Sequence, residues 1–300
     1  RRNLDTGEWE WDQNAVELAT VTGNVVELMR QKVVELPADT QFLLGHAACA
    51  GHSFSLAELA MLAGLDQTRV ARDLRPALRV GLVIPQDGQY REAQALAETA
   101  QVADIDATYR FLHDRVQQAC YERVDPAERG RRHAVIGRRM RHAFETAGGS
   151  NQKLLDLVWH LNLGAETLTS DDERRSLARL NLQAAKAAKA NGSYRLQASL
   201  VEQAQALLGD RAWQDEPAIS VELALERMEA DFMLREFDEV HRRAEAFLEL
   251  PFPSVPRLVA HDLRVRSCLA SGQYARGEAL GLEALASQGV AYPETNDECI

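Results

Sequence analysis

The stretch Thr108-Tyr-Arg-Phe-Leu-His-Asp-Arg-Val-Gln-Gln-Ala-Cys-Tyr121 changes from the period of a strand to the period of a helix. Its first part, Tyr109 to Leu112, is a short apolar run that predicts a strand. From Leu112 onward the apolar residues recur at the spacing of one helix face. The change falls at His113 and Asp114, and Asp114 is a suitable N-cap for the helix. A titratable pair at such a corner can face a ligand or can be a satisfied structural corner, and the spacing leaves both readings open.

Helical patterns precede this stretch. Ser55-Leu-Ala-Glu58 is a capping box, and Asp66 begins a pattern that Gly81 ends. The predicted helices cover 25–36 (after Asn24), 39–50, 55–64 and 66–81, and short strands follow at 82–84 and 109–112. Helices followed by two short strands predict a winged helix, with 92–106 as a variable insertion in its wing. The alternation at Trp9 and Trp11 predicts one further strand, and no others are expected.

The last part of the chain repeats one feature three times. A helix ends, a tight turn follows, and an aromatic residue begins the next helix. These turns are Asn191-Gly-Ser-Tyr194, Leu234-Arg-Glu-Phe237 and Ser271-Gly-Gln-Tyr274. Their spacings of 43 and 37 residues exceed the roughly 34 residues of tetratricopeptide (TPR) repeats. The pattern therefore predicts a TPR-like helical array in which Tyr194, Phe237 and Tyr274 are buried and Ala204, Ala246 and Ala284 lie at close helix approaches.

Composition limits the classes of protein that fit. Ala and Leu are abundant and only 6% of residues are aromatic, which favours a mainly α fold. The net charge of −11 argues against nonspecific binding to nucleic acid or anionic membranes. Four separated cysteines predict small core residues of a reduced, cytoplasmic protein. No apolar run is long enough for a membrane span, and no signal peptide is visible.

Residues for catalysis or metal binding are not grouped in recognisable motifs. Gly45, Gly51 and Gly64 are too sparse for a phosphate-binding loop. His133 and His142 stand among arginines, which suits a solvated cationic helix better than a zinc site. We therefore expect this segment to be no enzyme, and to hold no metal or cofactor of its own.

Four arginines form a stripe along the predicted helix at 66–81: Arg69, Arg72, Arg75 and Arg79. In a DNA-binding winged helix this element enters the major groove. A solvated face is the more usual role of such a stripe, and docking on an acidic domain is a third reading. DNA binding is the less favoured choice because affinity for DNA comes chiefly from phosphate neutralisation, whereas this chain is acidic.

Several motifs together resemble a known family. Phe111-Leu-His-Asp-Arg-Val-Gln-Gln-Ala119 resembles the segment that closes the ATPase module of bacterial STAND-type (signal-transduction) NTPases fused to histidine or Ser/Thr kinases. Asn24-Val-Val-Glu-Leu-Met29 looks like the start of the winged-helix region of the same family. The segments His160-Leu-Asn162 and Leu180-Asn-Leu182, with Lys186 and Lys189, look like its helical-repeat region.

The resemblance implies an organisation and a role. Residues 1–23 would be a strand and linker from a preceding ATPase domain, 24–147 a winged helix with a helical extension, and 151–300 an array incomplete at its C-terminal end. The turn-forming run Gly148-Gly149-Ser150 itself predicts the linker between these two parts. A winged-helix histidine of this family can reach the nucleotide phosphate, and His113 is the matching position. ATP or ADP and Mg²⁺ would be held by the parent ATPase domain.

Three functions stay open from the sequence. The first is a regulatory segment that couples the nucleotide state of an upstream ATPase domain to a protein or small-molecule signal on the array, and then to a sensor or kinase domain. The second is a DNA-binding transcriptional regulator with a TPR-like sensor. The third is a passive scaffold for protein–protein interaction.

Overall fold

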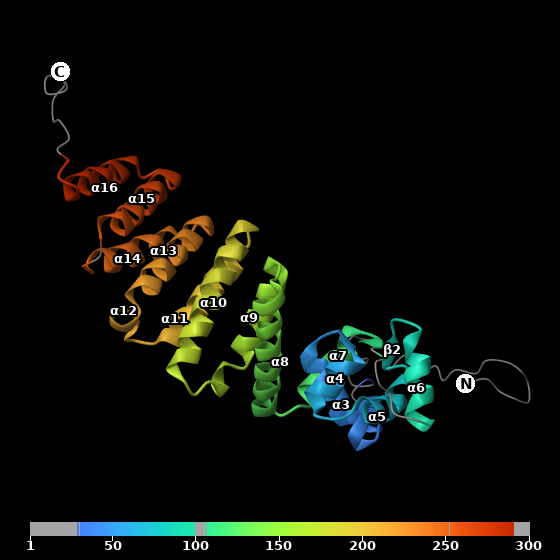
Figure 1. Cartoon of the computed structure of the whole chain (residues 1–300). Coiled ribbons are helices and arrows are strands. Elements are labelled where there is room, and N and C mark those ends of the chain that lie inside the picture. Colours follow the sequence, from blue (N-terminus) through green and yellow to red (C-terminus); the bar gives the residue numbers. More distant parts are fainter. Residues whose placement is uncertain (1–28, 30, 100–104, 106, 252, 291–300) are drawn as a thin grey trace, which may run out of the picture. The chain divides into compact units, whose positions relative to one another are not determined.

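A computed structural model describes residues 29, 31–99, 105, 107–251 and 253–290. The described chain is mainly helical with one small three-stranded sheet, as the sequence predicts (Figure 1). It divides into two compact units, residues 1–139 and 140–300. The run at Trp9 and Trp11, the cap at Asn24 and Cys299 lie outside the described residues. None of the described helices is both long and apolar enough to cross a bilayer.

Unit 1 alternates helices with short strands. Its elements are α3 (Ala38–Ala50), β1 (Ser53–Ser55), α4 (Leu56–Ala63), α5 (Gln67–Arg79), β2 (Val83–Pro85), α6 (Gln89–Thr99), β3 (Thr108–Phe111), α7 (Asp114–Glu122) and the first part of α8 (Pro126–Ala147). Residues 31–34 are also helical. Local signals set several of these limits. The capping box of Ser55 and Glu58 is formed, and Asp66 accepts a hydrogen bond from the Arg69 amide to cap α5.

Strand β3 is the middle strand of the sheet, between β1 and β2, and both pairings are antiparallel. Tyr109 and Phe111 are fully buried and alternate with half-buried neighbours. The Tyr109 ring stacks on Phe54 of β1 at 5.9 Å, and the Phe111 ring is tilted against Phe54 at 5.7 Å. The strand at 53–55 corrects the prediction that strands are confined to the wing and the tryptophan run. It is too short to show a period, and its pairing partner lies more than fifty residues away.

The predicted wing insertion contains a helix. Ala93 and Ala97 of α6 are fully buried, and α6 packs along α5. The two helices are also tied by polar groups, because the Arg75 guanidinium donates to Gln94 and the Gln94 amide donates to the Ala71 carbonyl at 2.7 Å. The Ala-rich composition of this segment is therefore explained by close packing of one helix on another.

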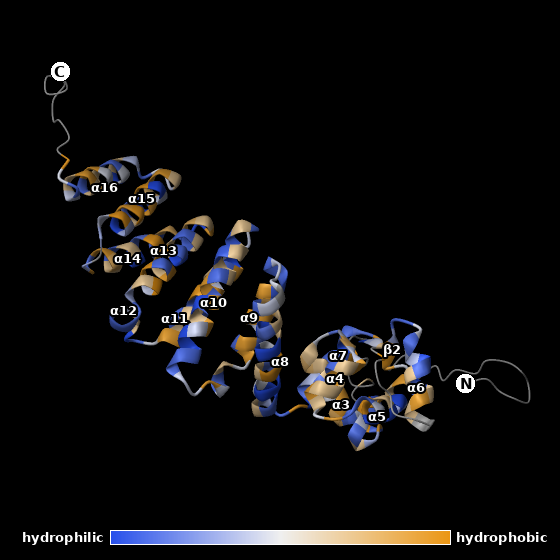
Figure 2. Cartoon of the chain, in the orientation of Figure 1, coloured by the Kyte–Doolittle hydropathy of each residue, from blue (hydrophilic) through white to orange (hydrophobic). Residues whose placement is uncertain are grey.

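Unit 2 is a succession of helices that pack on their neighbours in the chain. They are the end of α8, α9 (Asn151–Leu163), η1 (Ala165–Thr167), α10 (Asp171–Ala190), α11 (Tyr194–Leu208), α12 (Ala212–Asp215), α13 (Pro217–Met233), α14 (Phe237–Leu248), α15 (Ser254–Ala270) and α16 (Tyr274–Ser287). Figure 2 shows apolar and polar residues on the same helices of this unit. Such amphipathic helices bury their apolar sides by stacking on one another.

The three repeated turns share one backbone geometry. Gly192, Arg235 and Gly272 all have a positive φ, of 71°, 64° and 77°. In each turn the following residue donates its amide to a carbonyl five residues earlier, at 2.8–2.9 Å. This is the Schellman pattern that ends helices at a left-handed residue. The three turns are thus equivalent in structure, although the second uses an arginine where the others use glycine.

The aromatics of these turns begin helices as predicted, but their predicted burial is wrong. Tyr194 and Phe237 are only half-buried and Tyr274 is 68% exposed. A side chain at the first position of a helix has no preceding turn to lie against. The predicted close approach is confirmed at Ala204, which is fully buried, and is wrong at Ala246, which is exposed beside the buried Phe247.

Polar side chains fix the register between helices of unit 2. The amides of Asn162 and Asn181 exchange two hydrogen bonds, at 2.8 and 2.9 Å, and Asn181 is completely buried. Lys189 of α10 pairs with Glu226 and Glu229 of α13. A helix that slipped by one turn would leave these groups without partners, and unpaired buried amides are costly.

The structure divides the units within α8, at 139 and 140. Gly148, Gly149 and Ser150 lie after that helix, outside regular structure, and are exposed. Ser150 caps α9 by accepting the amide of Lys153. The predicted domain limits of 24–147 and 151–300 stay a prediction.

Candidate functional site

His113 lies at the exposed corner between β3 and α7. Its backbone is extended, and its Nδ1 accepts the amide of Arg115 at 3.1 Å, so His113 is the N-cap of α7. The prediction that Asp114 is the cap is therefore corrected by one residue. The side chains of Leu112, His113 and Asp114 are all exposed at this corner.

Asp114 has a different partner from the one expected. Its carboxylate is paired with Nδ1 of His52, which directly precedes β1, at 3.1 Å. The pair is solvent-exposed on the aspartate side, where 86% of the side chain is accessible, so its net contribution to stability is small. Asp114 therefore ties the corner to the neighbouring strand and does not orient the His113 ring.

The cap decides which nitrogen of His113 can donate. A ring nitrogen that accepts a backbone N–H carries no proton, so in the neutral ring the proton is on Nε2. The Nε2–H is then a donor beside the N-terminal end of α7, where the helix dipole favours an anion. The amides of Arg115 and Val116 in this first turn are already bonded to His113. The corner can therefore offer a hydrogen bond to an anionic oxygen.

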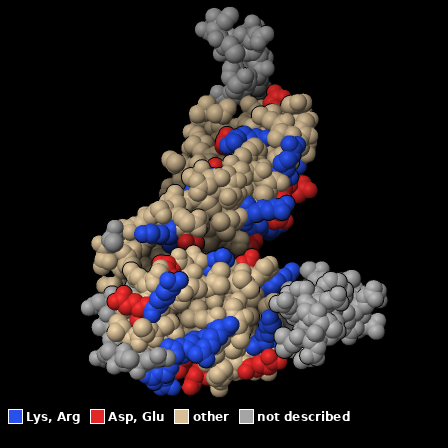
Figure 3. Space-filling view, turned by 90° about the vertical axis from the view of Figure 1, so that its right-hand side faces the viewer, with Lys and Arg blue, Asp and Glu red and all other residues tan. Residues whose placement is uncertain are grey.

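The arginine stripe of α5 is largely engaged within unit 1. Arg69 pairs with Asp73 at 3.3 Å and reaches Asp39 at 4.0 Å. Arg72 donates to the Ala97 carbonyl at 3.3 Å, and Arg75 donates to Gln94. Arg79 is exposed at the end of the helix. On the face of the molecule drawn in Figure 3, basic side chains lie beside acidic ones.

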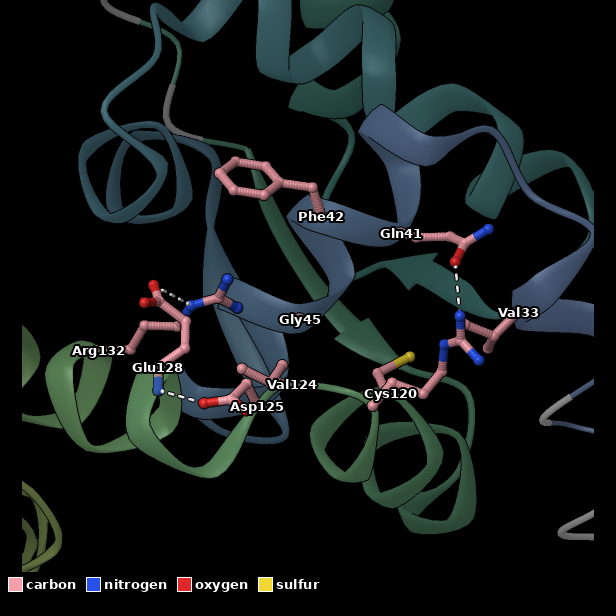
Figure 4. A pocket seen from close by; sticks show the side chains of 10 residues that line it. Val33, Gln41, Phe42, Gly45, Cys120, Val124, Asp125, Glu128 and Arg132 are labelled. Carbon is pink, nitrogen blue, oxygen red and sulfur yellow. Dashed lines mark hydrogen bonds and ion pairs between the residues drawn. The ribbon is translucent and has the colours of Figure 1, made fainter.

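A pocket of about 260 Å³ lies between α3, α7 and the start of α8, at the edge of the unit 1 core (Figure 4). Its charged residues are paired with one another or with neutral groups. Arg132 pairs with Glu128 at 3.3 Å, and Arg123 donates to Gln41 at 3.0 Å. Asp125 accepts the amides of Ala127 and Glu128 and so caps α8. These pairs tie together the helices around the pocket, whereas Nη1 of Arg132 is buried without a hydrogen-bond partner among the described residues.

The thiols near this pocket are poor nucleophiles. Burial raises the pKa of Cys120 to about 12 and that of Cys49 to about 11, so both are protonated near neutral pH. Cys49, Cys120 and Cys268 are buried and free, as predicted for core cysteines. Within the described ranges, no three His, Cys, Asp or Glu side chains are grouped closely enough to hold a metal ion.

His133 was expected on a solvated face, and the structure corrects this. The ring is buried in unit 1, and its Nε2 shares a hydrogen bond of 3.0 Å with the Tyr121 hydroxyl. Burial, together with the smaller effect of the nearby Arg129, lowers the pKa of His133 to about 4. The signal in the sequence was the helical spacing to Ile136 and Gly137, which lie on the same buried face. His142, by contrast, is exposed as predicted.

Gly45 allows α8 to approach α3 in this pocket. A Cβ at this position would lie 2.9 Å from the Arg132 guanidinium and from the Val124 side chain. We expect Gly45→Ala to lower the free energy of unfolding of unit 1 by up to about 2 kcal/mol. The usual overpacking cost of about 1–3 kcal/mol is offset by about 1 kcal/mol, because Ala is favoured over Gly inside a helix. Urea unfolding followed by circular dichroism would measure it. Gly88→Ala is the matched control, since a Cβ there has no neighbour within 4 Å, and an equal loss in both variants would contradict the argument.

Comparison with known proteins gives a distant relative. The chain is 24% identical over 288 residues to hybrid signal transduction histidine kinase G of Dictyostelium discoideum, covering 81% of this chain and 8% of that protein. No protein-family model matches the chain, and no solved structure matches it. The chain thus spans a small part of the length of the relative it matches, which is a signal-transduction kinase.

Proposed function

We propose that this chain is a regulatory segment of a multidomain signalling protein, which couples the nucleotide state of an ATPase domain to a signal sensed by the helical array. The observation that carries the proposal is the corner at His113, where the ring that caps α7 has its Nε2–H free to donate at an exposed helix N-terminus. The likeness to a signal-transduction histidine kinase supports a signalling context. The kinase or other output would belong to the parent chain.

The order of elements in unit 1 supports a winged helix. A strand lies between α3 and α4, and β2 and β3 form an antiparallel pair after α5. The connection between those two strands contains α6. In STAND-type proteins a winged helix packs over the nucleotide domain and stabilises the closed, ADP-bound state. His113 suits that role, because an N–H bond to a phosphate oxygen is charge-assisted and helps only the state that forms it.

The repeated hairpins of unit 2 support a sensory role. Stacked helix pairs with equivalent turns form the extended surfaces on which repeat proteins bind partners. A ligand that binds one conformation of the parent more tightly than another shifts the balance between them. The array would act in this way on the nucleotide domain through the rest of the chain.

This chain would contact only the phosphate end of a nucleotide. The His113 ring would contact a phosphate oxygen, whereas the phosphate-binding loop and Mg²⁺ would be supplied by the ATPase domain of the parent. ATP hydrolysis is that domain's chemistry. This chain would hold one protonated ring nitrogen near the phosphate in one state and withdraw it in the other.

Substituting His113 in the parent protein tests the proposal. We expect His113→Ala to weaken ADP binding relative to ATP binding by tenfold or more, because a charge-assisted bond present in one state is worth about 1.5–3 kcal/mol. Basal signalling should rise. Affinities for both nucleotides, measured on wild type and variant by calorimetry, give the ratio.

The cap needs its own control, since losing an N-cap costs about 1 kcal/mol whatever the function. His113→Asn keeps a good cap but lacks the Nε2–H, so it should change the nucleotide ratio as His113→Ala does without the loss of stability. If His113→Asn leaves the ratio unchanged, His113 is a structural cap and has no part in the switch.

DNA binding gains no support from unit 1. The face of α5 that would enter a major groove is partly covered by α6, and two of its arginines donate to that helix. A gel shift with duplex DNA near physiological salt is expected to show no complex. Tight, sequence-dependent binding would favour the transcriptional reading instead.

A further inference from the structure

An open apolar groove of about 930 Å³ runs between α9 and α11 within unit 2. One wall is a stripe on α9, Leu155, Trp159 and Leu163, spaced four residues apart. The other wall is a stripe on α11, Leu196, Leu200 and Leu207. In Figure 1, α9, α10 and α11 lie side by side, and α10 packs on both of the others.

Part of each wall is exposed to solvent, although Leu200 is buried. Trp159 is 54% exposed, Leu163 40% and Leu196 41%. Large apolar side chains that gather on one surface of a soluble unit usually mark a binding site. Their polar neighbours in the groove are mostly amides and hydroxyls, such as Gln152, Ser199 and Gln203, which suit the edge of an interface.

The shape selects the kind of ligand. A small-molecule site typically buries about 70–90% of its ligand, whereas this groove is only partly enclosed. Its stripes extend over nine and twelve residues, or about 12 and 16 Å from first to last residue at the rise of a helix. Two parallel stripes of that length match two to three turns of an amphipathic helix, the arrangement of helix-in-groove recognition.

The charged residues that line the groove favour a positively charged partner. Asp156 and Glu166 line the groove, against the single guanidinium of Arg174. Arg174 donates to the Leu168 carbonyl at 3.0 Å, and Asp156 accepts one hydrogen bond from Gln152 and has further lone pairs available. A partner with basic residues beside its apolar stripe therefore complements this surface, whereas a second copy of this chain, with its net charge of −11, does not.

We propose that the groove between α9 and α11 binds a basic amphipathic helix of another protein. The apolar side chains of that helix would lie against Trp159 and Leu196, and its Lys or Arg side chains would lie near Asp156 and Glu166. The inference names the partner class of the array, and in that respect it rests on the proposed sensory function. Its test does not require the nucleotide domain.

The probe is a fluorescein-labelled helical peptide of about sixteen residues, with Leu at every third or fourth position and Lys on both sides of that stripe. A second peptide carries Glu in place of Lys. Fluorescence anisotropy with the whole chain near 0.15 M salt measures both affinities. We expect the Lys peptide to bind at least tenfold more tightly than the Glu peptide, and Asp156→Lys to reduce that preference severalfold.

Groove substitutions locate the binding. Trp159→Ala and Leu196→Asp should each weaken the Lys peptide tenfold or more. Both positions are partly exposed, so folding is retained, and circular dichroism melting verifies it. Val255→Asp is the matched control, because Val255 of α15 is 69% exposed and lies outside the groove, and it should bind as wild type does.

Each other outcome overturns the inference. A basic amphipathic helix would be excluded as the partner if both peptides bind equally, if neither binds, or if the groove variants do not alter the affinity. Binding of an apolar dye at the groove without binding of peptide would indicate a small-molecule site. A dimer in light scattering that Trp159→Ala abolishes would indicate a second copy. None of these results alters the nucleotide ratio of the His113 variants, so the two proposals fail separately.

Discussion

Replacing Asp231 by Asn is expected to lower the free energy of unfolding of unit 2 by about 3 kcal/mol. The Asp231 carboxylate is completely buried on α13 and lies between two guanidinium groups, Arg227 of its own helix and Arg243 of α14, each at 2.8 Å. Removing one partner of a buried ion pair costs about 3–5 kcal/mol, because the remaining charge stays buried. The lower end applies here, since Arg227 also pairs with Glu202 of α11.

The measurement is thermal unfolding followed by tryptophan fluorescence, because Trp213 packs against the α13–α14 core. About 3 kcal/mol in a unit of this size corresponds to a fall in Tm of roughly 6–12 °C. Asp262→Asn is the matched control. Asp262 pairs with Arg266 at 3.4 Å, but its side chain is 60% exposed, so its loss should be within about 1 kcal/mol. If Tm falls equally in both variants, burial does not increase the contribution of Asp231 to stability.

Asp231 also shows what holds neighbouring repeats in register. Its carboxylate joins α13 to α14, and Arg227 continues the connection to α11. Together with the Asn162–Asn181 pair and the Lys189 pairs, these groups specify which helix faces meet. The family resemblance pointed to Asn162, Asn181 and Lys189 without a physical role, and the structure gives them one in packing.

Local signals predicted the helices of this chain well because they depend on residues close in sequence. The capping box at Ser55, the cap at Asp66 and the three turns were all predicted in this way. The second turn was found although Arg235 replaces glycine, since its aromatic and spacing match the others. The strand 53–55 was missed because it exists only through pairing with β3.

The candidate site was harder to predict for similar reasons. His113 was identified as a corner residue, but its capping role was assigned to Asp114, since Asp is a far more usual N-cap than His. The engagement of Arg72 and Arg75 depends on α6, which was expected to be an insertion without a defined role. The exposed groove on α9 and α11 needed the structure, because sequence periodicity cannot tell which apolar face stays uncovered.

Burial of His133 predicts that unit 1 loses stability in mild acid. The folded-state pKa is lowered to about 4, from the ordinary value of 6.5, chiefly by burial. As the pH falls below about 6.5, the unfolded chain takes up a proton at His133 and the folded chain does not, so unfolding becomes easier. The loss grows until the pH reaches about 4, where 2.5 pKa units correspond to about 3 kcal/mol. Above about pH 6.5 this group has no such effect. The pKa of the buried His46 is also lowered by burial, which adds to the loss in the same direction.

Urea unfolding near pH 7 and near pH 4.5 measures this contribution as a difference between variants. His133→Gln keeps a hydrogen-bonding group near the Tyr121 hydroxyl but cannot take up the proton, so unit 1 of this variant should lose about 2 kcal/mol less than wild type between the two pH values. Carboxylates that titrate in the same range are present in both proteins, so their contribution cancels when the two losses of stability are compared. His142→Gln, which replaces an exposed histidine on the same helix, controls for the loss of a histidine. If His133→Gln and wild type lose stability in parallel, the folded chain takes up a proton at His133 at the same pH as the unfolded chain. The protonated ring would then donate its Nε2–H to the Tyr121 hydroxyl oxygen in acid.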